Sequence, residues 1–116
     1  MSLSDTVLLE HMCAECRKII ETTSKISFQQ FMDDYIYQDS LIRQLEIVGE
    51  AAGQLSMEFC TDNPEIPVSH MKGFRNVLAH QYFAVDLKTV WKIALYDIPE
   101  LMKSLSGFVN SEGSEL

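Results

Sequence analysis

The sequence lacks the features that would place it in a membrane or send it out of the cell. It has no apolar run of about 18 residues, the length that a membrane-spanning helix needs. Its first residues, Met1-Ser2-Leu3-Ser4-Asp5, show neither the basic region nor the apolar region of a secretory signal. We therefore expect a cytoplasmic protein that does not bind membranes.

Cysteine is scarce, and its number is odd. The chain has three cysteines, Cys13, Cys16 and Cys60, which argues against a disulfide framework in a chain without an export signal. Cys13 and Cys16 form a C-x-x-C pair, and His11 and Cys60 are conceivable further zinc ligands. However, the pair falls within a helical pattern and lacks the tight turn or second C-x-x-C of structural zinc sites. We therefore expect reduced thiols, no metal and no cofactor.

Positive charge is also in short supply. The chain has 9 Lys and Arg against 17 Asp and Glu, a net charge of −8, whereas nucleic-acid binding depends on Lys and Arg. Residues 66–96 are an exception, because their balance of +3 leaves −11 for the rest of the chain. The charged residues of this segment are Lys72, Arg75, Lys88, Lys92 and Asp86. Positive charge is thus concentrated around one segment, although an ordinary solvated helix face has a similar composition.

Proline and glycine are few, and no segment alternates apolar and polar residues as a strand does. Instead, apolar residues recur at spacings of three and four, which is typical of helices with one buried face. The predicted helical segments are about residues 5–23, a short helix after Ser27, and about residues 34–59, 68–80 and 86–105. We predict an all-α fold, an antiparallel bundle of four to five helices, over residues 1–108, followed by a polar tail at 109–116.

Cap residues and one proline set the expected helix boundaries. The predicted N-caps are Ser4 or Asp5, Ser27 and Asp86. Pro99 is expected to kink or restart the last helix, because proline lacks the N–H that an interior helical position donates. Asp97 is expected to cap the part that follows.

The most informative segment is residues 73–83, where polar functional groups lie among apolar residues. Asn76 and His80 are four residues apart and share a helix face. Arg75 and His80 are five apart, about 140° around an α-helix. Their side chains converge only near a helix end, or in a pocket that a second copy of the chain completes.

Arginine and histidine together suit phosphodiester chemistry. The guanidinium of Arg75 can bind phosphate oxygens and stabilise charge that develops on them. The imidazole of His80 titrates near neutral pH and can move the protons of an attacking 2′-hydroxyl and a leaving 5′-oxygen. No acidic cluster with metal-ligand spacing lies nearby in the sequence, so a metal-free reaction is favoured.

The motif Arg75-x4-His80-x-Tyr82 resembles the R-x4-H-x-Y signature of the HepT toxins of the HEPN superfamily. The resemblance extends over about residues 5–106. Residues 45–51, LEIVGEA, resemble the family's L-E-I-I-G-E-A segment, and Asp97-Ile98-Pro99 resembles its D-L-P. The segments Ile66-Pro67, residues 82–87 and Val90-Trp91 fit the family as well.

The resemblance implies a HEPN-like homodimeric bundle that is a metal-independent endoribonuclease toxin, with RNA as its substrate and 2′,3′-cyclic phosphate ends as product. Arg75 would hold the scissile phosphate and His80 would be the acid and base. Asn76 would orient phosphate or imidazole. Glu50 is a possible orienting partner for His80 or Arg75, but a solvated helix carboxylate explains it equally well.

The resemblance also implies a partner. In a type VII toxin–antitoxin pair, an MntA-like minimal nucleotidyltransferase transfers AMP to the motif tyrosine, here Tyr82. The added bulk and negative charge would block RNA beside the phosphate pocket. One departure from the family is residues 68–70, VSH, where relatives often carry an aromatic and basic stretch. We expect His70 to be a surface residue and not a second catalytic base.

Two other functions remain open on the sequence alone. The acidic surface fits a non-catalytic helical module that docks on a nucleotidyltransferase and presents Tyr82 or a nucleotide without cutting RNA. A purely structural helical dimer is the other alternative, and the intact Arg75, His80 and Tyr82 argue against it.

Overall fold

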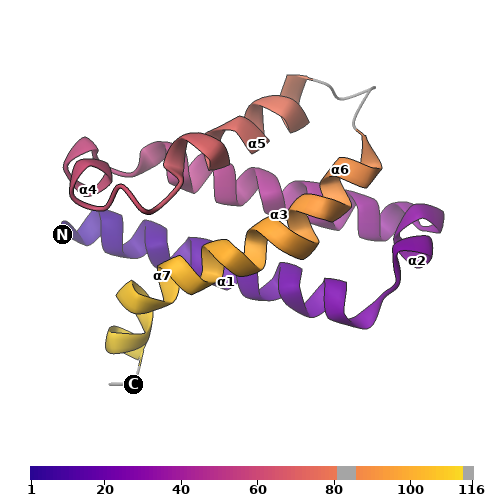
Figure 1. Ribbon diagram of the computed structural model, residues 1–116, viewed down its shortest axis with the longest axis horizontal. Helices are drawn as coiled ribbons and strands as arrows, with labels where there is room; N and C mark the ends of the chain where they lie inside the picture. The colour runs from indigo at the N-terminus through magenta and orange to yellow at the C-terminus, as the bar shows by residue number, and fades with distance from the viewer. Residues whose placement is uncertain (81–85, 114–116) are drawn as a thin grey trace.

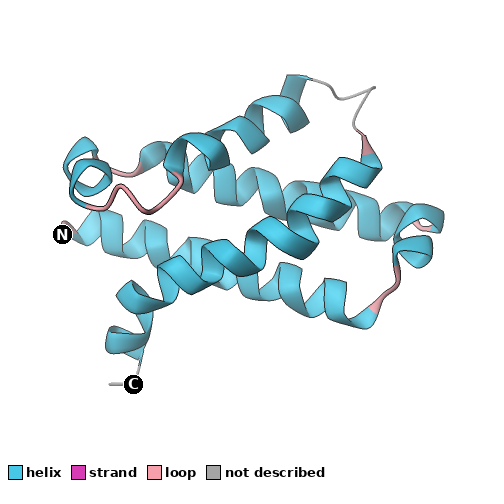
Figure 2. Cartoon of the chain, viewed as in Figure 1, coloured by secondary structure: helices cyan, strands magenta, loops and turns pink. Residues whose placement is uncertain are grey.

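The computed structural model describes the backbone of residues 1–80 and 86–113, and the side chains of residues 1–74 and 86–108. These residues form helices and no strand (Figures 1 and 2). The elements are α1 (Leu3–Lys25), α2 (Phe28–Asp33), α3 (Tyr35–Gln54), α4 (Met57–Asp62), α5 (Val68–His80), α6 (Leu87–Lys92), the π-helical segment η1 (Ile93–Asp97) and α7 (Ile98–Gly113). The all-α prediction is confirmed. No described helix is long and apolar enough to cross a lipid bilayer.

The long helices form an antiparallel bundle. α1 and α3 run side by side in opposite directions, α5 returns along α3, and α6, η1 and α7 together cross over α1 (Figure 1). The most extensive packing is between α3 and α5, α1 and α3, and α1 and α7. α5 thus packs on α3, while α6 packs on α2 and α3, and η1 on α1.

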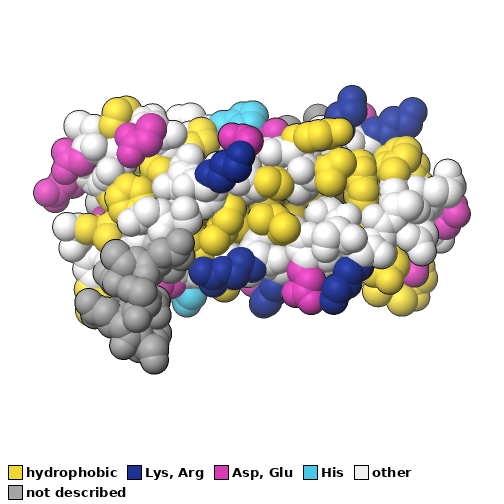
Figure 3. Space-filling model, turned by 60° about the horizontal axis from the view of Figure 1, so that its bottom comes forward, with side chains coloured by type: hydrophobic (Ala, Val, Ile, Leu, Met, Phe, Trp, Pro, Cys, Tyr) yellow, Lys and Arg dark blue, Asp and Glu magenta, His cyan; other side chains and the backbone are white. Residues whose placement is uncertain are grey.

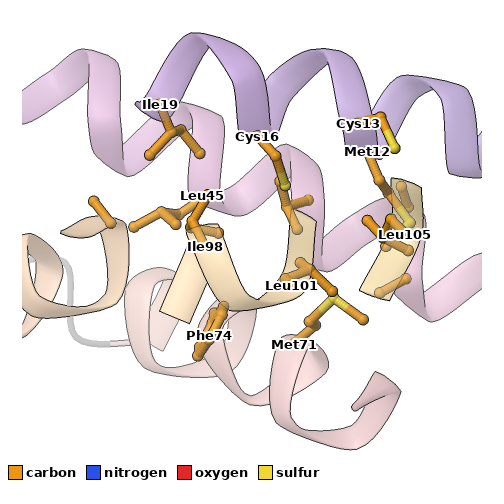
Figure 4. Close-up of a cluster of buried hydrophobic side chains, with 14 of the residues drawn as sticks. Met12, Cys13, Cys16, Ile19, Leu45, Met71, Phe74, Ile98, Leu101 and Leu105 are labelled. Atoms are coloured by element: carbon orange, nitrogen blue, oxygen red, sulfur yellow. The ribbon is translucent and has the colours of Figure 1, made fainter. Parts of the chain in front are cut away.

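The core lies where these helices meet (Figure 4). α1 contributes Met12, Cys16 and Ile19, and α7 contributes Leu105, all with no exposed surface. Leu45 of α3 is equally buried. Burying one large apolar side chain is worth roughly 1.5–3 kcal/mol, so these contacts, rather than helix propensity, hold the bundle together.

The N-terminal cap differs from the prediction. Ser2, and not Ser4 or Asp5, caps α1, because its hydroxyl accepts a hydrogen bond from the backbone N–H of Asp5 at 3.1 Å. The Asp5 side chain does not cap the helix. Asp5 is 2% exposed, and its carboxylate accepts hydrogen bonds from the backbone N–H and the hydroxyl of Ser56. A tertiary contact therefore uses the carboxylate that the sequence offered as a cap.

The same contact corrects the predicted helix over residues 34–59. α3 ends at Gln54, and a separate helix, α4, begins after Ser56. The Ser56 hydroxyl caps α4 by accepting from the N–H of Phe59 at 3.1 Å. Asp5 binds the backbone N–H and the hydroxyl of Ser56, which holds the chain out of helical register at this point. Phe59 is nevertheless buried, as the sequence pattern predicted.

The other predicted caps are confirmed. Ser27 and Gln30 form a reciprocal capping box at α2. Asp86 caps α6 by accepting from the N–H of Lys88 at 3.0 Å and from the hydroxyl of Thr89 at 2.9 Å.

The helix continues through Pro99 without a break. The segment η1 joins α6 to α7, and the N–H of Ile98 donates to the carbonyl of Ile93, five residues back. Such a π-helical turn changes the hydrogen-bond spacing just before the proline, which cannot donate to a residue four positions earlier. The prediction that Asp97 caps a new helix is therefore wrong. Asp97 lies within η1, and its carboxylate is 3.3 Å from Nε2 of His70.

Candidate active site

Helix α5 carries three of the residues that the sequence singled out. It follows Ile66-Pro67, and the N–H of Met71 donates to the carbonyl of Pro67 at 3.1 Å, closing the first turn. Arg75, Asn76 and His80 lie on its C-terminal half. Their backbone is described and their side chains are not, while Tyr82 lies outside the described residues.

The helical register shows which way the His80 position faces. Met71 and Phe74 are buried, with 1% and 6% exposure, and mark the side of α5 that packs on the bundle. Position 80 comes nine residues after Met71, which is about 180° around an α-helix. It therefore shares a stripe with the exposed Ser69 and with Gly73, opposite the core. Asn76 belongs to the same stripe.

The Arg75 position lies on a different edge of α5. It is four residues after Met71, about 40° around the helix, and about 140° from position 80. This edge borders α3, since a Cβ placed on Gly53 would lie 3.8 Å from Cε of Lys72. Within one chain, α5 thus presents its arginine and histidine positions on different sides.

Two glutamates of α3 lie along this border. α3 and α5 are antiparallel (Figure 1). The proximity of Gly53 to Lys72 therefore places position 50 level with position 75, and position 46 level with position 79. Glu50 and Glu46 are both half-buried. Glu46 also pairs with Arg43 at 3.4 Å, on the exposed side.

Glu50 was predicted from the sequence as a partner that orients His80 or Arg75, whereas Glu46 was not predicted to take part in the site. The spacing of the two glutamates could have indicated Glu46, because they are four residues apart and share a helix face with Gly53. The sequence does not show how far α5 is shifted along α3. This shift places the two carboxylates beside the part of α5 that carries the motif.

A cleft of about 670 Å³ opens between α5 and the α6–η1 segment. We call it the α5–α6 cleft and define it by His70, Gly73 and Phe74 on α5 and by Lys92, Ile93 and Tyr96 on the opposite wall. His70 packs edge-on against Phe74, with ring centroids 4.8 Å apart, and its side chain is 63% exposed. His70 is therefore a surface residue, as the sequence predicted.

Two of the three cysteines are in the core of the bundle, and Cys60 lines a shallow pocket with Ser69 and His70. Cys13 and Cys16 of α1 are fully buried, and burial raises the pKa of the Cys16 thiol to about 12. A thiol with so high a pKa stays protonated at neutral pH and is a poor metal ligand and nucleophile. Among the described residues, no three His, Cys, Asp or Glu side chains are placed to hold a metal ion.

Comparison with known proteins identifies the family. The profile of a family described as "Ribonuclease HepT-like" matches residues 12–106, which include α3, α5 and all of η1. This chain belongs to the HepT-like ribonuclease family. The family resemblance predicted from the motif is thus confirmed over most of the sequence.

Named relatives agree with this family assignment. The HepT-like chain is 36% identical over 104 residues to "Putative RNase TTE0752" of Caldanaerobacter subterraneus, covering 90% of this chain and 93% of the relative. It is 39% identical over 101 residues to "Probable ribonuclease HepT" of Thermococcus cleftensis, with 87% and 92% covered. It is also 36% identical over 87 residues to "Putative RNase MJ1380" of Methanocaldococcus jannaschii, with 75% and 80% covered. No solved structure gives a significant match.

Proposed function

We propose that this HepT-like chain is a metal-independent endoribonuclease that acts as a homodimer. The observation that carries the proposal is the family match across α5, together with the register that turns position 80 away from the core. A histidine facing away from the core can reach a phosphodiester without opening the bundle. The local balance of +3 over residues 66–96 supports an anionic ligand at this helix.

The proposed reaction needs one phosphate-binding group and two proton transfers. Arg75 binds the scissile phosphate, and the imidazole of His80 takes the proton of the 2′-hydroxyl as its oxygen attacks phosphorus. The bond from phosphorus to the 5′-oxygen breaks, and a second imidazole protonates that oxygen. The products are a 2′,3′-cyclic phosphate and a free 5′-hydroxyl. Asn76, on the stripe of position 80, orients the phosphate or the imidazole.

The angle between the two motif positions supports a dimer. Positions 75 and 80 lie about 140° apart on α5, so a second copy of the chain offers a direct way to bring an arginine and a histidine to one phosphate. Two copies related by a two-fold axis along this face would place Arg75 of one copy beside His80 of the other. They would also supply both imidazoles that the reaction uses.

We further propose that Glu50 positions Arg75. The two positions are level on adjacent antiparallel helices, and Glu50 is half-buried, so its carboxylate is screened less than one in open solvent. Glu46 is placed for the same role one turn further along. A guanidinium held by a carboxylate loses less freedom when it binds phosphate.

Neutralisation by AMP transfer to Tyr82 completes the proposed function. Tyr82 is two residues beyond His80, so an AMP group there adds negative charge beside the phosphate-binding residues. The donor would be an MntA-like minimal nucleotidyltransferase, in a type VII toxin–antitoxin pair. Intact mass after co-expression with such an enzyme should increase in units of AMP, and Tyr82→Phe should abolish the increase.

The decisive experiment measures RNA cleavage in EDTA by the purified protein. Wild type should cut RNA and leave 2′,3′-cyclic phosphate ends, detected by mass spectrometry of the fragments. Arg75→Ala and His80→Ala should each lower the rate, the histidine change by about 10²- to 10⁴-fold, the usual range for an acid–base group. His11→Ala, at an exposed position of α1, is the matched control and should cut normally.

A non-catalytic docking module is the second candidate, which the net charge of −8 favours. It predicts a stable complex with the nucleotidyltransferase that survives His80→Ala, and no RNA cleavage by the free chain. If wild type and His80→Ala show the same cleavage, or lack of it, on several RNAs, the result would favour this alternative.

A further inference from the structure

The α5–α6 cleft has no role in the reaction described above, yet it lies beside the motif. Gly73 lines the cleft and shares the stripe of α5 that includes positions 76 and 80. Position 80 is seven residues further along the helix, about 10 Å in an α-helix. A molecule bound in the cleft would therefore approach the residues proposed to cut RNA.

Gly73 leaves the α5 wall of the cleft open to a ligand from outside the chain. Glycine in the middle of a helix is less favourable than alanine, and Gly73 has no positive φ that would require it. A Cβ built at Gly73 would meet no described atom within 4 Å, so packing within the chain does not exclude a side chain either. The missing side chain leaves room for something that approaches the backbone closely.

The walls of the cleft fit an unpaired nucleobase. Its volume of about 670 Å³ is in the range of small-molecule sites, roughly 300–1,000 Å³. Phe74 and Ile93 give the cleft an apolar lining. Two aromatic side chains, Tyr96 and His70, also line it, and they are 64% and 63% exposed. Unpaired bases bind proteins largely by stacking on such rings.

Lysines on α6 supply the complementary charge. Lys88 and Lys92 are exposed, and Lys92 lines both the cleft and a neighbouring hollow of about 270 Å³ that reaches Phe28. Asp97 is the acidic residue among the described lining residues, and it lies 3.3 Å from Nε2 of His70. In a chain of net charge −8, the two lysines at the border of the cleft and the hollow favour a ligand with a flat base and a phosphate. Figure 3 shows how hydrophobic side chains border Lys and Arg side chains on one face of the molecule.

We propose that the α5–α6 cleft binds an unpaired nucleotide of the RNA substrate, within a few nucleotides of the cleaved bond. The base packs against Tyr96 and His70, and an adjoining phosphate meets Lys92. This inference rests on the proposed ribonuclease function and adds to it a preference for single-stranded RNA. It also assigns Lys92 and Tyr96, outside the motif, to substrate binding.

The test measures RNA binding in a His80→Ala background, where cleavage does not interfere. The probe is a fluorescein-labelled single-stranded oligoribonucleotide of mixed sequence, followed by fluorescence anisotropy. The cleft variants are Gly73→Leu, Lys92→Ala and Tyr96→Ala. Each has a matched control at an exposed site outside the cleft, namely Gly107→Leu, Lys103→Ala and Tyr35→Ala. Gly107, like Gly73, is helical and would accept a Cβ without contact within 4 Å.

Each cleft variant should weaken binding relative to its control. Tyr96→Ala should lose roughly five- to 150-fold in affinity, the range for one stacked base. Lys92→Ala should reduce the slope of log affinity against log salt by about 0.7, as expected for one phosphate contact on a single strand. Gly73→Leu should weaken binding by filling the cleft. The same RNA annealed to its complement should bind more weakly than the single strand.

The outcomes separate this proposal from the ribonuclease function on which it rests. If wild type cleaves RNA and the cleft variants bind and cleave like their controls, the nucleotide site is wrong while the ribonuclease function stands. If wild type neither binds nor cleaves RNA, both are wrong. If Gly73→Leu instead dissociates the dimer in sedimentation experiments, the cleft is an interface between copies and the nucleotide site is again overturned.

Discussion

The buried carboxylate of Asp5 holds Ser56, 51 residues away along the chain. Oδ1 accepts the backbone N–H of Ser56 at 2.9 Å, and Oδ2 accepts its hydroxyl at 2.6 Å. Ser56 in turn caps α4. This contact ties the first turn of α1 to the point where α3 ends and α4 begins, and so helps to fix the direction in which the chain turns back toward α5.

Removing this carboxylate should destabilise the fold. We expect Asp5→Ala to lower the free energy of unfolding by about 1–3 kcal/mol, because both groups of Ser56 lose their acceptor in a half-buried place. Urea denaturation followed by circular dichroism measures the change. Asp39→Ala, at an exposed position of α3, is the control and should lie within about 0.5 kcal/mol of wild type. Equal midpoints for the two variants would contradict the role of Asp5.

The same contact should make stability depend on pH in the acid range. The hydrogen bonds from the side chain and backbone of Ser56 lower the pKa of Asp5 below its usual value near 3.8. Because the unfolded chain then binds the proton more readily, the contribution of Asp5 is full above the unfolded pKa of about 3.9 and is lost as pH falls through the lower folded pKa. The stability difference between wild type and Asp5→Asn, measured at several pH values, should therefore shrink below about pH 4. A difference that stays constant down to pH 2 would contradict the assignment.

Phe31 should matter far more to stability than its neighbour Phe28. Phe31 is fully buried with its ring centroid 5.2 Å from that of Trp91, whereas Phe28 is 38% exposed and 6.0 Å away. Phe31→Ala should cost about 3–5 kcal/mol, and Phe28→Ala clearly less. Trp91 is the chain's one tryptophan, so its fluorescence follows unfolding near this cluster directly. Similar losses for the two variants would show that the cluster is not packed as described.

Gly73 should be replaceable by alanine with a gain in stability. Gly73→Ala should raise the free energy of unfolding by about 0.5–1 kcal/mol, since the added methyl group meets nothing and alanine favours the helix. Thermal unfolding should show a similar gain for Gly107→Ala, which lies in a comparable place on α7. If Gly73→Ala lost stability while Gly107→Ala gained it, a side chain at position 73 would clash with other atoms of the protein or its dimer.

Local sequence signals predicted most of the helices correctly. Ser27 and Asp86 cap the helices that they were expected to cap, because a cap depends on residues within one turn. The single predicted helix over residues 34–59 was wrong. The backbone is extended at Leu55 and Ser56, where Ser56 binds Asp5, a residue far away in the sequence. Pro99 was expected to kink or restart the last helix. Of these two outcomes the restart is wrong, because a π-helical turn precedes the proline and the chain stays helical through it.

The sequence by itself determined the helical class, the buried stripes and the family, since periodicity and the motif around Arg75 and His80 are local patterns. Only the tertiary structure decided which helices are neighbours. It placed Glu46 and Glu50 beside α5 and opened a cleft between α5 and the α6–η1 segment. The physical reason is that packing joins residues far apart in the chain, through shapes and distances that a pattern of residue types does not specify.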